Sequence, residues 1–268
     1  CPAICDEYAQ KDNRVVVIHK KNTGYGHSIN VGIERATSDY IGIIDSDDWI
    51  EPETIEFLIR NAILYDVDIV TCAFNTSTKN EATIDIWEQD KVILEFLRHK
   101  RLNGSLCNKL IKREIIQHLS FATDISYGED ALFVWQALQS VKKILVTNKS
   151  LYNYRRNEQS ISHQKWDPDR KGSGHKVWDS ICRDTRFNWP QFESVALARF
   201  ALEDMWGLYF AALSDYPYDS HIEERQLNIR KNIKHIRNHK LDGYTKYLTA
   251  VVLCRWYGFG KILKRLFS

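Results

Sequence analysis

The N-terminal part of the chain alternates short apolar runs with stretches that have the periodicity of amphipathic helices. Strands are expected at 15–18, 40–44 and 68–74, and helices at 1–10, 26–36 and 52–65. Strands separated by helices predict an α/β sheet with parallel pairs, covered by helices on both faces.

Beyond about residue 85 helical patterns dominate. Helices are expected at 90–99, 113–118 and 130–140, and two short strands at 143–146 and 151–154. The polar stretch 157–174, which ends in Gly172-Ser173-Gly174, is typical of a mobile loop or linker. Nearly everything after 177 has a helical pattern. We therefore expect an α/β domain over 1–165 and a helical C-terminal region over 166–268.

Composition and charge narrow the class of protein. The net charge of the 268 residues is only +2, so the protein has no strong positive electrostatic field that would favour nucleic acid as a partner. The six cysteines have no CxxC spacing, which suits reduced thiols in the cytoplasm better than a disulfide framework. The chain opens without a signal-peptide pattern, and no apolar run approaches the roughly 18 residues that span a bilayer. We expect a cytoplasmic protein.

An acidic turn follows the apolar run at 40–44. Asp45, Asp47 and Asp48 lie at the carboxyl end of this predicted strand, where open α/β sheets bind ligands. Carboxylates packed together repel one another unless a cation or hydrogen-bond donors neutralise them. A hard divalent cation that bridges carboxylates and a substrate diphosphate would do so. A solvated acidic turn and a phosphohydrolase built on Asp45 and Asp47 are the alternatives.

A second candidate motif is Gly128-Glu129-Asp130. Glycine, two acids and then an apolar-periodic run predict a turn into a helix N-terminus. The helix dipole stabilises an ionised carboxylate there by roughly 0.3–1 kcal/mol. Such a carboxylate, directed into a cleft, is able to take a proton from a hydroxyl nucleophile. Simple capping of the helix is the alternative.

The order of the motifs resembles that of a known family. The motifs are Asn22-x-Gly24, Asn30-x-Gly32, Tyr40-Ile41, Asp45-Ser46-Asp47-Asp48, Pro52 with Ile55-Glu56, Asn108-Lys109 with Arg113-Glu114, Gly128-Glu129-Asp130, and Tyr154-Arg155 with Ser160-Ile161-Ser162. This ordered set, over about residues 1–165, resembles the family 2 glycosyltransferases. The resemblance implies the GT-A fold, a Rossmann-like, mostly parallel sheet flanked by helices. It also implies inverting transfer of a sugar from a nucleoside diphosphate, which we expect to be UDP.

The resemblance assigns roles to the two acidic motifs. Asp47 is expected to be the main ligand of Mn²⁺ or Mg²⁺ on the diphosphate. Asp45 would contact the nucleotide ribose or the metal, and Asp48 would support them. Asp130 resembles the general base, with Glu129 orienting the acceptor or the base.

Further donor contacts are expected outside these motifs. Asn22 matches a position near the nucleotide base, and Arg155 or Arg156 would meet the diphosphate, since a guanidinium fork matches phosphate oxygens. His163 is a candidate metal or phosphate contact, with a solvated loop histidine as the alternative. The segment 103–109 lines the acceptor side or forms a plain loop.

The sequence departs from the family pattern in two places. The family's opening strand with its Pro-x-Tyr-Asn-like turn, and the Asp-Asp-Gly-Ser turn that follows, do not occur in it. We expect that strand–turn unit to lie upstream of residue 1. Ile29 stands where many members have an arginine, so one diphosphate contact is missing.

The C-terminal tail and the expected acceptor bear on partners. Residues 255–267 mix aromatic, aliphatic and basic side chains, which suits a helix lying on an anionic membrane surface. A helix packed on its own domain or on a partner subunit is the alternative, and the helix expected at 195–212 is core or homodimer surface. The resemblance implies a glycan or lipid-linked acceptor in surface polysaccharide synthesis. A non-catalytic module that binds sugar nucleotides or glycans is the competing hypothesis.

Overall fold

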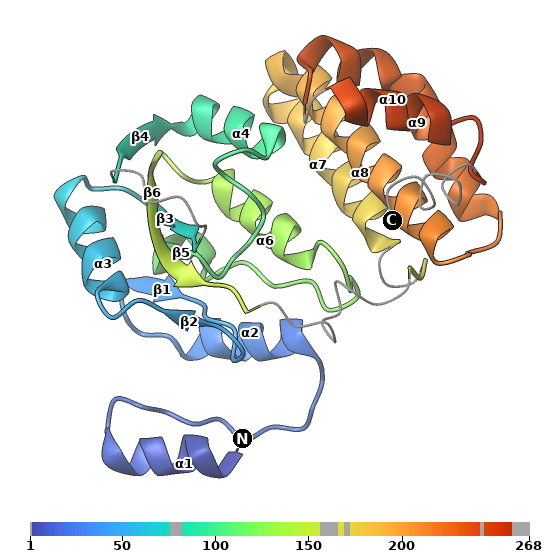
Figure 1. Cartoon of the computed structure of the whole chain (residues 1–268). Helices are drawn as coiled ribbons and strands as arrows, with labels where there is room; N and C mark the ends of the chain where they lie inside the picture. The colour runs from blue at the N-terminus through green and yellow to red at the C-terminus, as the bar shows by residue number, and fades with distance from the viewer. Residues whose placement is uncertain (1, 76–81, 156–165, 169–171, 242–243, 259–268) are drawn as a thin grey trace.

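The computed structural model describes residues 2–75, 82–155, 166–168, 172–241 and 244–258. Its strands are β1 Tyr40–Gly42, β2 Trp49–Ile50, β3 Ile69–Phe74, β4 Ile84–Glu88, β5 Lys109–Lys112 and β6 Lys143–Asn153. Its helices are α1 Pro2–Lys11, α2 Tyr25–Arg35, α3 Thr54–Leu64, α4 Gln89–Arg98, α5 Arg113–Ile116, α6 Glu129–Leu138, α7 Ser173–Asn188, η2 Pro190–Phe192, α8 Glu193–Leu213, α9 Ser220–His239 and α10 Tyr244–Leu253. An α/β part and a bundle of C-terminal helices lie beside one another, as expected (Figure 1).

The sheet is mixed rather than mostly parallel. Its order is β1-β5-β3-β6-β2, with β4 also paired to β6. Among the described strands only β3 and β6 pair in parallel, and the other pairs are antiparallel. The expectation of a mostly parallel sheet is wrong because β4 and β5 were not predicted, and both add antiparallel neighbours.

Three local predictions are also wrong. Residues 15–18 are not a strand: Val16 is 77% exposed, and no described strand pairs with this run. An apolar run becomes a strand only where a partner offers its backbone hydrogen bonds. The two strands expected at 143–146 and 151–154 form one strand, β6. The linker expected at 157–174 falls mostly outside the described residues, but α7 already begins at Ser173, which is buried.

Both faces of the sheet are covered. Side chains alternate between faces along a strand, so Ile69 and Ile144 pack into one apolar cluster while Val70 and Leu145 pack into another. The second cluster lies under α3. The first extends from α2 through α4 and α6 into the C-terminal helices. One face of the sheet therefore shares a continuous core with the helical region.

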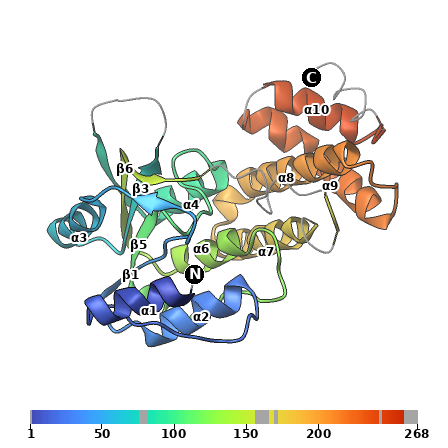
Figure 2. The same ribbon diagram turned by 60° about the horizontal axis from the view of Figure 1, so that its bottom comes forward.

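The C-terminal helices α7 and α8 lie beside α6 and α4 of the α/β part (Figure 2). Two polar contacts fix them there. Trp135 of α6 donates to Asp184 of α7 over 2.9 Å. The buried guanidinium of Arg199 on α8 donates to the backbone carbonyls of Leu97 (3.3 Å) and Arg98 (2.8 Å) at the end of α4. A cation there satisfies carbonyls that the helix itself leaves unpaired. None of the helices within the described ranges combines the length and the hydropathy that a bilayer span requires.

Candidate active site

The acidic turn lies directly beyond β1. The backbone N–H of Asp48 donates to the carbonyl of Asp45 over 3.1 Å, which closes the turn. Asp45 and Asp48 are half-buried, whereas Asp47 between them is exposed. The turn therefore directs two of the three predicted carboxylates toward the protein and leaves the third in solvent.

Two tyrosines from distant elements hold the inward carboxylates. The Tyr152 hydroxyl of β6 donates to Asp48 Oδ2 over 2.7 Å and accepts from the backbone N–H of Asp45 over 3.2 Å. The Tyr25 hydroxyl at the start of α2 donates to Asp45 Oδ1 over 3.3 Å. The backbone N–H of Arg155 donates to Asp48 Oδ1 over 2.8 Å. Neither tyrosine was predicted, because each reaches the turn through the tertiary fold.

The same carboxylates form the candidate metal group. Potential ligand atoms of Asp45, Asp48 and Cys107 all lie within 4.8 Å of one another. Burial, and then repulsion by Asp48, raises the pKa of Asp45, as expected for acids packed without a cation. Burial raises the pKa of the Cys107 thiol to about 12, so it stays protonated at neutral pH. The two carboxylates suit Mg²⁺ or Mn²⁺, which prefer oxygen ligands, better than the soft sulfur of Cys107 does.

Asp130 lies in the first turn of α6, which begins after Gly128 in the left-handed conformation (φ 87°). The residue is half-buried, but its Oδ1 is enclosed and has no hydrogen-bond partner among the described residues. Burial, followed by the charges of Glu129 and Asp45, raises the pKa of Asp130 to about 7. A buried carboxylate that titrates near neutrality is suited to accept a proton.

Two neighbours on separate segments tie Asp130 to the rest of the site. The backbone N–H of Leu106 lowers the pKa of Asp130. The ammonium group of Lys109, at the start of β5, lowers the pKa of Asp130 and opposes the effect of burial. Lys109 is itself buried, donates to Asn108 Oδ1 over 2.9 Å, and has its pKa lowered to about 8 by burial. The segment 103–109 thus packs on the candidate base.

The remaining predicted residues are placed less closely together. Glu129 is half-buried, and burial raises its pKa. Asn22 is exposed, and its Oδ1 accepts from the Gly24 backbone N–H over 3.1 Å. The Arg155 side chain is exposed beside the acidic turn. Arg156 and His163 lie outside the described residues.

A known family model covers the N-terminal part of this arrangement. The model described as "Glycosyl transferase family 2" matches residues 1–119. Over these residues the chain is similar to that family. The matched part includes α2, the acidic turn, Cys107 and Lys109, and the match ends before α6 and Asp130.

Relatives and solved structures extend the likeness further along the chain. EpsH of Bacillus subtilis is 34% identical over 172 residues, which are 60% of this chain and 50% of that protein. The minor teichoic acid biosynthesis protein GgaB of the same species is 26% identical over 233 residues, 81% of this chain and 25% of its own length. The chain thus spans half or less of these relatives.

The crystal structure of S. aureus TarS 1-349 in complex with UDP-GlcNAc superposes with a TM-score of 0.62 at 16% identity. The superposition covers 97% of this chain and 74% of that one. It confirms the expected GT-A fold, helical C-terminal region included.

Proposed function

We propose that this protein is an inverting glycosyltransferase that moves a sugar from a UDP-sugar to a hydroxyl of a glycan or lipid-linked acceptor in bacterial surface polysaccharide synthesis. The observation that carries the proposal is the enclosed Asp130 carboxylate, which has an unpaired oxygen and lies within electrostatic reach of the acidic turn. A base and a cation site close to one another are what a single-displacement sugar transfer needs.

The comparisons support the donor and the setting. TarS, which shares the fold, was crystallised with UDP-GlcNAc, and GgaB is named for teichoic acid biosynthesis. A UDP-sugar and an envelope polymer are therefore the first donor and product class to test.

The acidic turn would hold the metal. Asp45 and Asp48 offer inward carboxylate oxygens for Mn²⁺ or Mg²⁺, and Asp47 is exposed on the same turn, facing solvent from which a donor would enter. When bound, the cation supplies positive charge that stabilises the departing diphosphate. Tyr25 and Tyr152 fix the orientation of these carboxylates before donor binds, which reduces the reorganisation that binding requires.

Asp130 would perform the proton transfer. The acceptor oxygen forms its bond to the anomeric carbon as the bond to the diphosphate breaks, and the hydroxyl proton passes to Asp130. A pKa of about 7 leaves a large fraction of this carboxyl ionised at neutral pH while keeping it basic. Lys109 stabilises the ionised form from the other side, and Glu129 is placed in the same helical turn to orient the acceptor.

Peripheral roles complete the proposal. Asn22, which is exposed, would contact the nucleotide base, and Arg155 or Arg156 would contact the diphosphate. His163 would contact the metal or a phosphate. The tail 255–267, of which 259–267 lies outside the described residues, would contact the membrane.

Donor binding is tested by calorimetric titration of UDP with and without Mn²⁺. Wild type is expected to bind only with the metal, and Asp47→Ala and Asp48→Asn are expected to weaken binding at least tenfold by removing negative charge from the cation site. Asp179→Asn, an exposed acid on α7, is the matched control and should bind as wild type does. Metal-independent binding, or equal loss in the control, would contradict the metal site.

Catalysis is tested by UDP release from a panel of UDP-sugars. Asp130→Asn should keep UDP affinity and lose at least a hundredfold in turnover, the usual contribution of a general base. A non-catalytic binding module predicts no turnover in either protein. Full activity in Asp130→Asn would exclude Asp130 as the base.

A further inference from the structure

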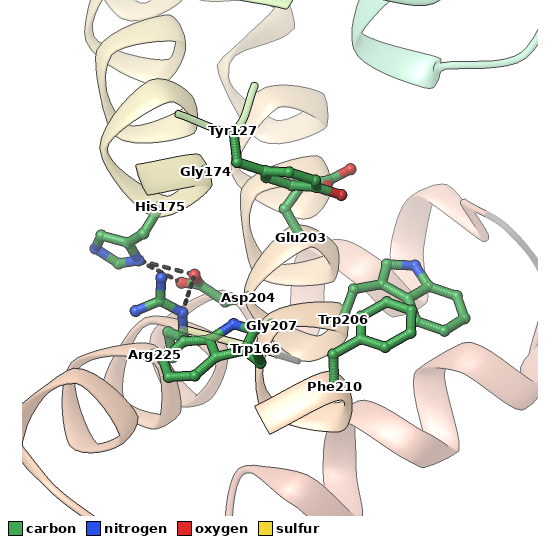
Figure 3. A pocket seen from close by; sticks show the side chains of 10 residues that line it. All are labelled: Tyr127, Trp166, Gly174, His175, Glu203, Asp204, Trp206, Gly207, Phe210 and Arg225. Carbon is green, nitrogen blue, oxygen red and sulfur yellow. Dashed lines mark hydrogen bonds and ion pairs between the residues drawn. The ribbon is translucent and has the colours of Figure 1, made fainter. Parts of the chain in front are cut away.

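A cavity lies between α7, α8 and α9 (Figure 3). Its volume is about 220 Å³. Its lining includes Tyr127, Trp166, Glu203, Trp206, Phe210 and Arg225. This is smaller than the roughly 300–1,000 Å³ typical of pockets for drug-sized ligands, so it suits one ring better than a whole nucleotide sugar.

Aromatic rings form one wall of this cavity. Trp206 and Phe210, one turn apart on α8, stack with centroids 5.9 Å apart and planes inclined by 26°. Phe210 is 42% exposed although it is a large apolar side chain. The Tyr127 ring reaches the cavity from the turn before α6 (Figure 3). Partly exposed rings around a hollow offer flat apolar faces to a ligand.

The opposite wall is polar and firmly held. Asp204 is 1% exposed and accepts from His175 Nδ1 (2.8 Å) and Asn228 Nδ2 (2.7 Å). The Arg225 Nε lies 3.7 Å from the same carboxylate. This network compensates the buried charge, so the wall is preorganised rather than adaptable.

Two further polar residues line the cavity. Trp166 is only 5% exposed, and its Nε1 has no hydrogen-bond partner among the described residues. An unpaired buried donor is unfavourable, but this atom is enclosed, so a ligand hydroxyl would pair with it only if the Trp166 ring shifted. The Glu203 carboxylate lies near the Tyr127 hydroxyl (Figure 3), and its Oε1 is 3.6 Å from Nη1 of Arg199, so it forms part of an ion pair at the edge of the cavity.

Tyr127 connects this cavity with the candidate active site. It precedes Asp130 by three residues, and its backbone N–H and carbonyl both bond to Ser173 Oγ, over 3.0 and 2.9 Å. Burial, followed by the negative charges of Glu203 in the cavity and Glu129 in α6, raises the pKa of its phenol. One fixed side chain therefore forms a wall of the cavity and borders the helical turn that carries the base.

We propose that this cavity binds one sugar unit of the acceptor glycan, remote from the hydroxyl that reacts. Flat apolar faces opposite carboxylate and N–H groups match a pyranose ring, which has apolar C–H faces and equatorial hydroxyls. The inference rests on the proposed function for its biological meaning. It implies that the enzyme recognises an acceptor longer than one sugar.

Saccharide binding is measured by saturation-transfer NMR, without donor, on the complete chain. The probes are the methyl β-glycosides of glucose, galactose, N-acetylglucosamine and N-acetylgalactosamine, and the disaccharides cellobiose, lactose and chitobiose. At least one probe should bind wild type, and Phe210→Ala and Glu203→Gln should weaken it about three- to tenfold, the effect of one aromatic or hydrogen-bond contact. Phe187→Ala, the same change at an 87% exposed site on α7, should have no effect.

UDP with Mn²⁺ separates this inference from the proposed function. Saccharide binding that UDP does not displace and that Asp47→Ala leaves intact supports a separate sugar site. Displacement by UDP, binding of no probe, or equal binding in Phe210→Ala and Glu203→Gln would overturn it. If UDP binds and no saccharide does, only this inference fails; if saccharides bind and UDP does not, the proposed function fails while the sugar site stands.

Discussion

Replacing Asp130 by asparagine should stabilise the protein at alkaline pH while abolishing its activity. Burial, and repulsion by Glu129 and Asp45, raises the pKa of Asp130 from 3.8 to about 7 in the folded protein. Between these two values the folded state holds a proton that the unfolded state has released. Stability therefore falls as pH rises through this window, because the folded state must either keep the proton or bury a charge. Asparagine has nearly the same shape and no charge to bury.

The size of the effect follows from the shift. The pKa of Asp130 is raised by about three units, and each unit is worth 1.36 kcal/mol. Above pH 8 the buried carboxylate therefore lowers the free energy of unfolding by roughly 4 kcal/mol, and below pH 4 it lowers it very little. Between pH 5 and pH 8 the stability difference between variant and wild type should grow by roughly 2–3 kcal/mol. This is a large part of the 5–15 kcal/mol that ordinarily separates folded from unfolded proteins.

Urea denaturation followed by tryptophan fluorescence measures the free energy of unfolding at pH 5 and pH 8. EDTA is included so that no cation shields the carboxylates. Asp179→Asn, which removes an exposed acid on α7, should track wild type at both values. A difference between Asp130→Asn and wild type that does not change with pH would refute the conclusion that Asp130 is buried at an energetic penalty.

Four further outcomes are expected. Wild-type kcat/KM should fall below about pH 7, where Asp130 becomes protonated, and a pH profile with no such limb contradicts that role. A Cβ added at Gly104 would lie 2.5 Å from the Cβ of Ala131 on α6, so Gly104→Ala should lower the free energy of unfolding by about 1–3 kcal/mol. Gly42→Ala should lower it less, because the nearest atom there is 3.6 Å away. Cys107→Ser should change Mn²⁺ affinity less than threefold in calorimetry, because Mn²⁺ prefers the carboxylate oxygens of Asp45 and Asp48 to a soft sulfur ligand. Asp68 accepts two backbone N–H bonds at the start of β6, and Asp68→Ala should lower the denaturation midpoint by the equivalent of about 1–3 kcal/mol.

The local pattern of apolar and polar residues was enough to predict the helices and the acidic turn. Helical periodicity is repeated every turn within one segment, so α2, α3, α4 and α6 were predicted within a few residues of their observed ends. The turn at Asp45–Asp48 was predicted because an apolar strand and three acids adjoin in sequence. The position of Asp130 at a helix N-terminus followed from the glycine and the acids before the apolar run.

The strands depended on partners that the sequence does not indicate. β5 begins with Lys109 and reads as a loop, but it lies between β1 and β3 and is buried there. The apolar run 15–18 has no strand beside it among the described residues and remains exposed. Strand formation requires a second strand to accept and donate hydrogen bonds, and that neighbour is set by the topology of the whole sheet.

The site was likewise assembled by the fold. Tyr152 bonds to Asp48 across 104 positions of sequence and Tyr25 to Asp45 across 20, so no local spacing announces either contact. Cys107 and Lys109 reach the same place because β5 runs beside β1. The sequence by itself thus determined which carboxylates are available, since their turns are local. Only the tertiary structure decided which of them point inward, which are neutralised and which titrate near neutral pH, because burial and long-range charge depend on what packs around them.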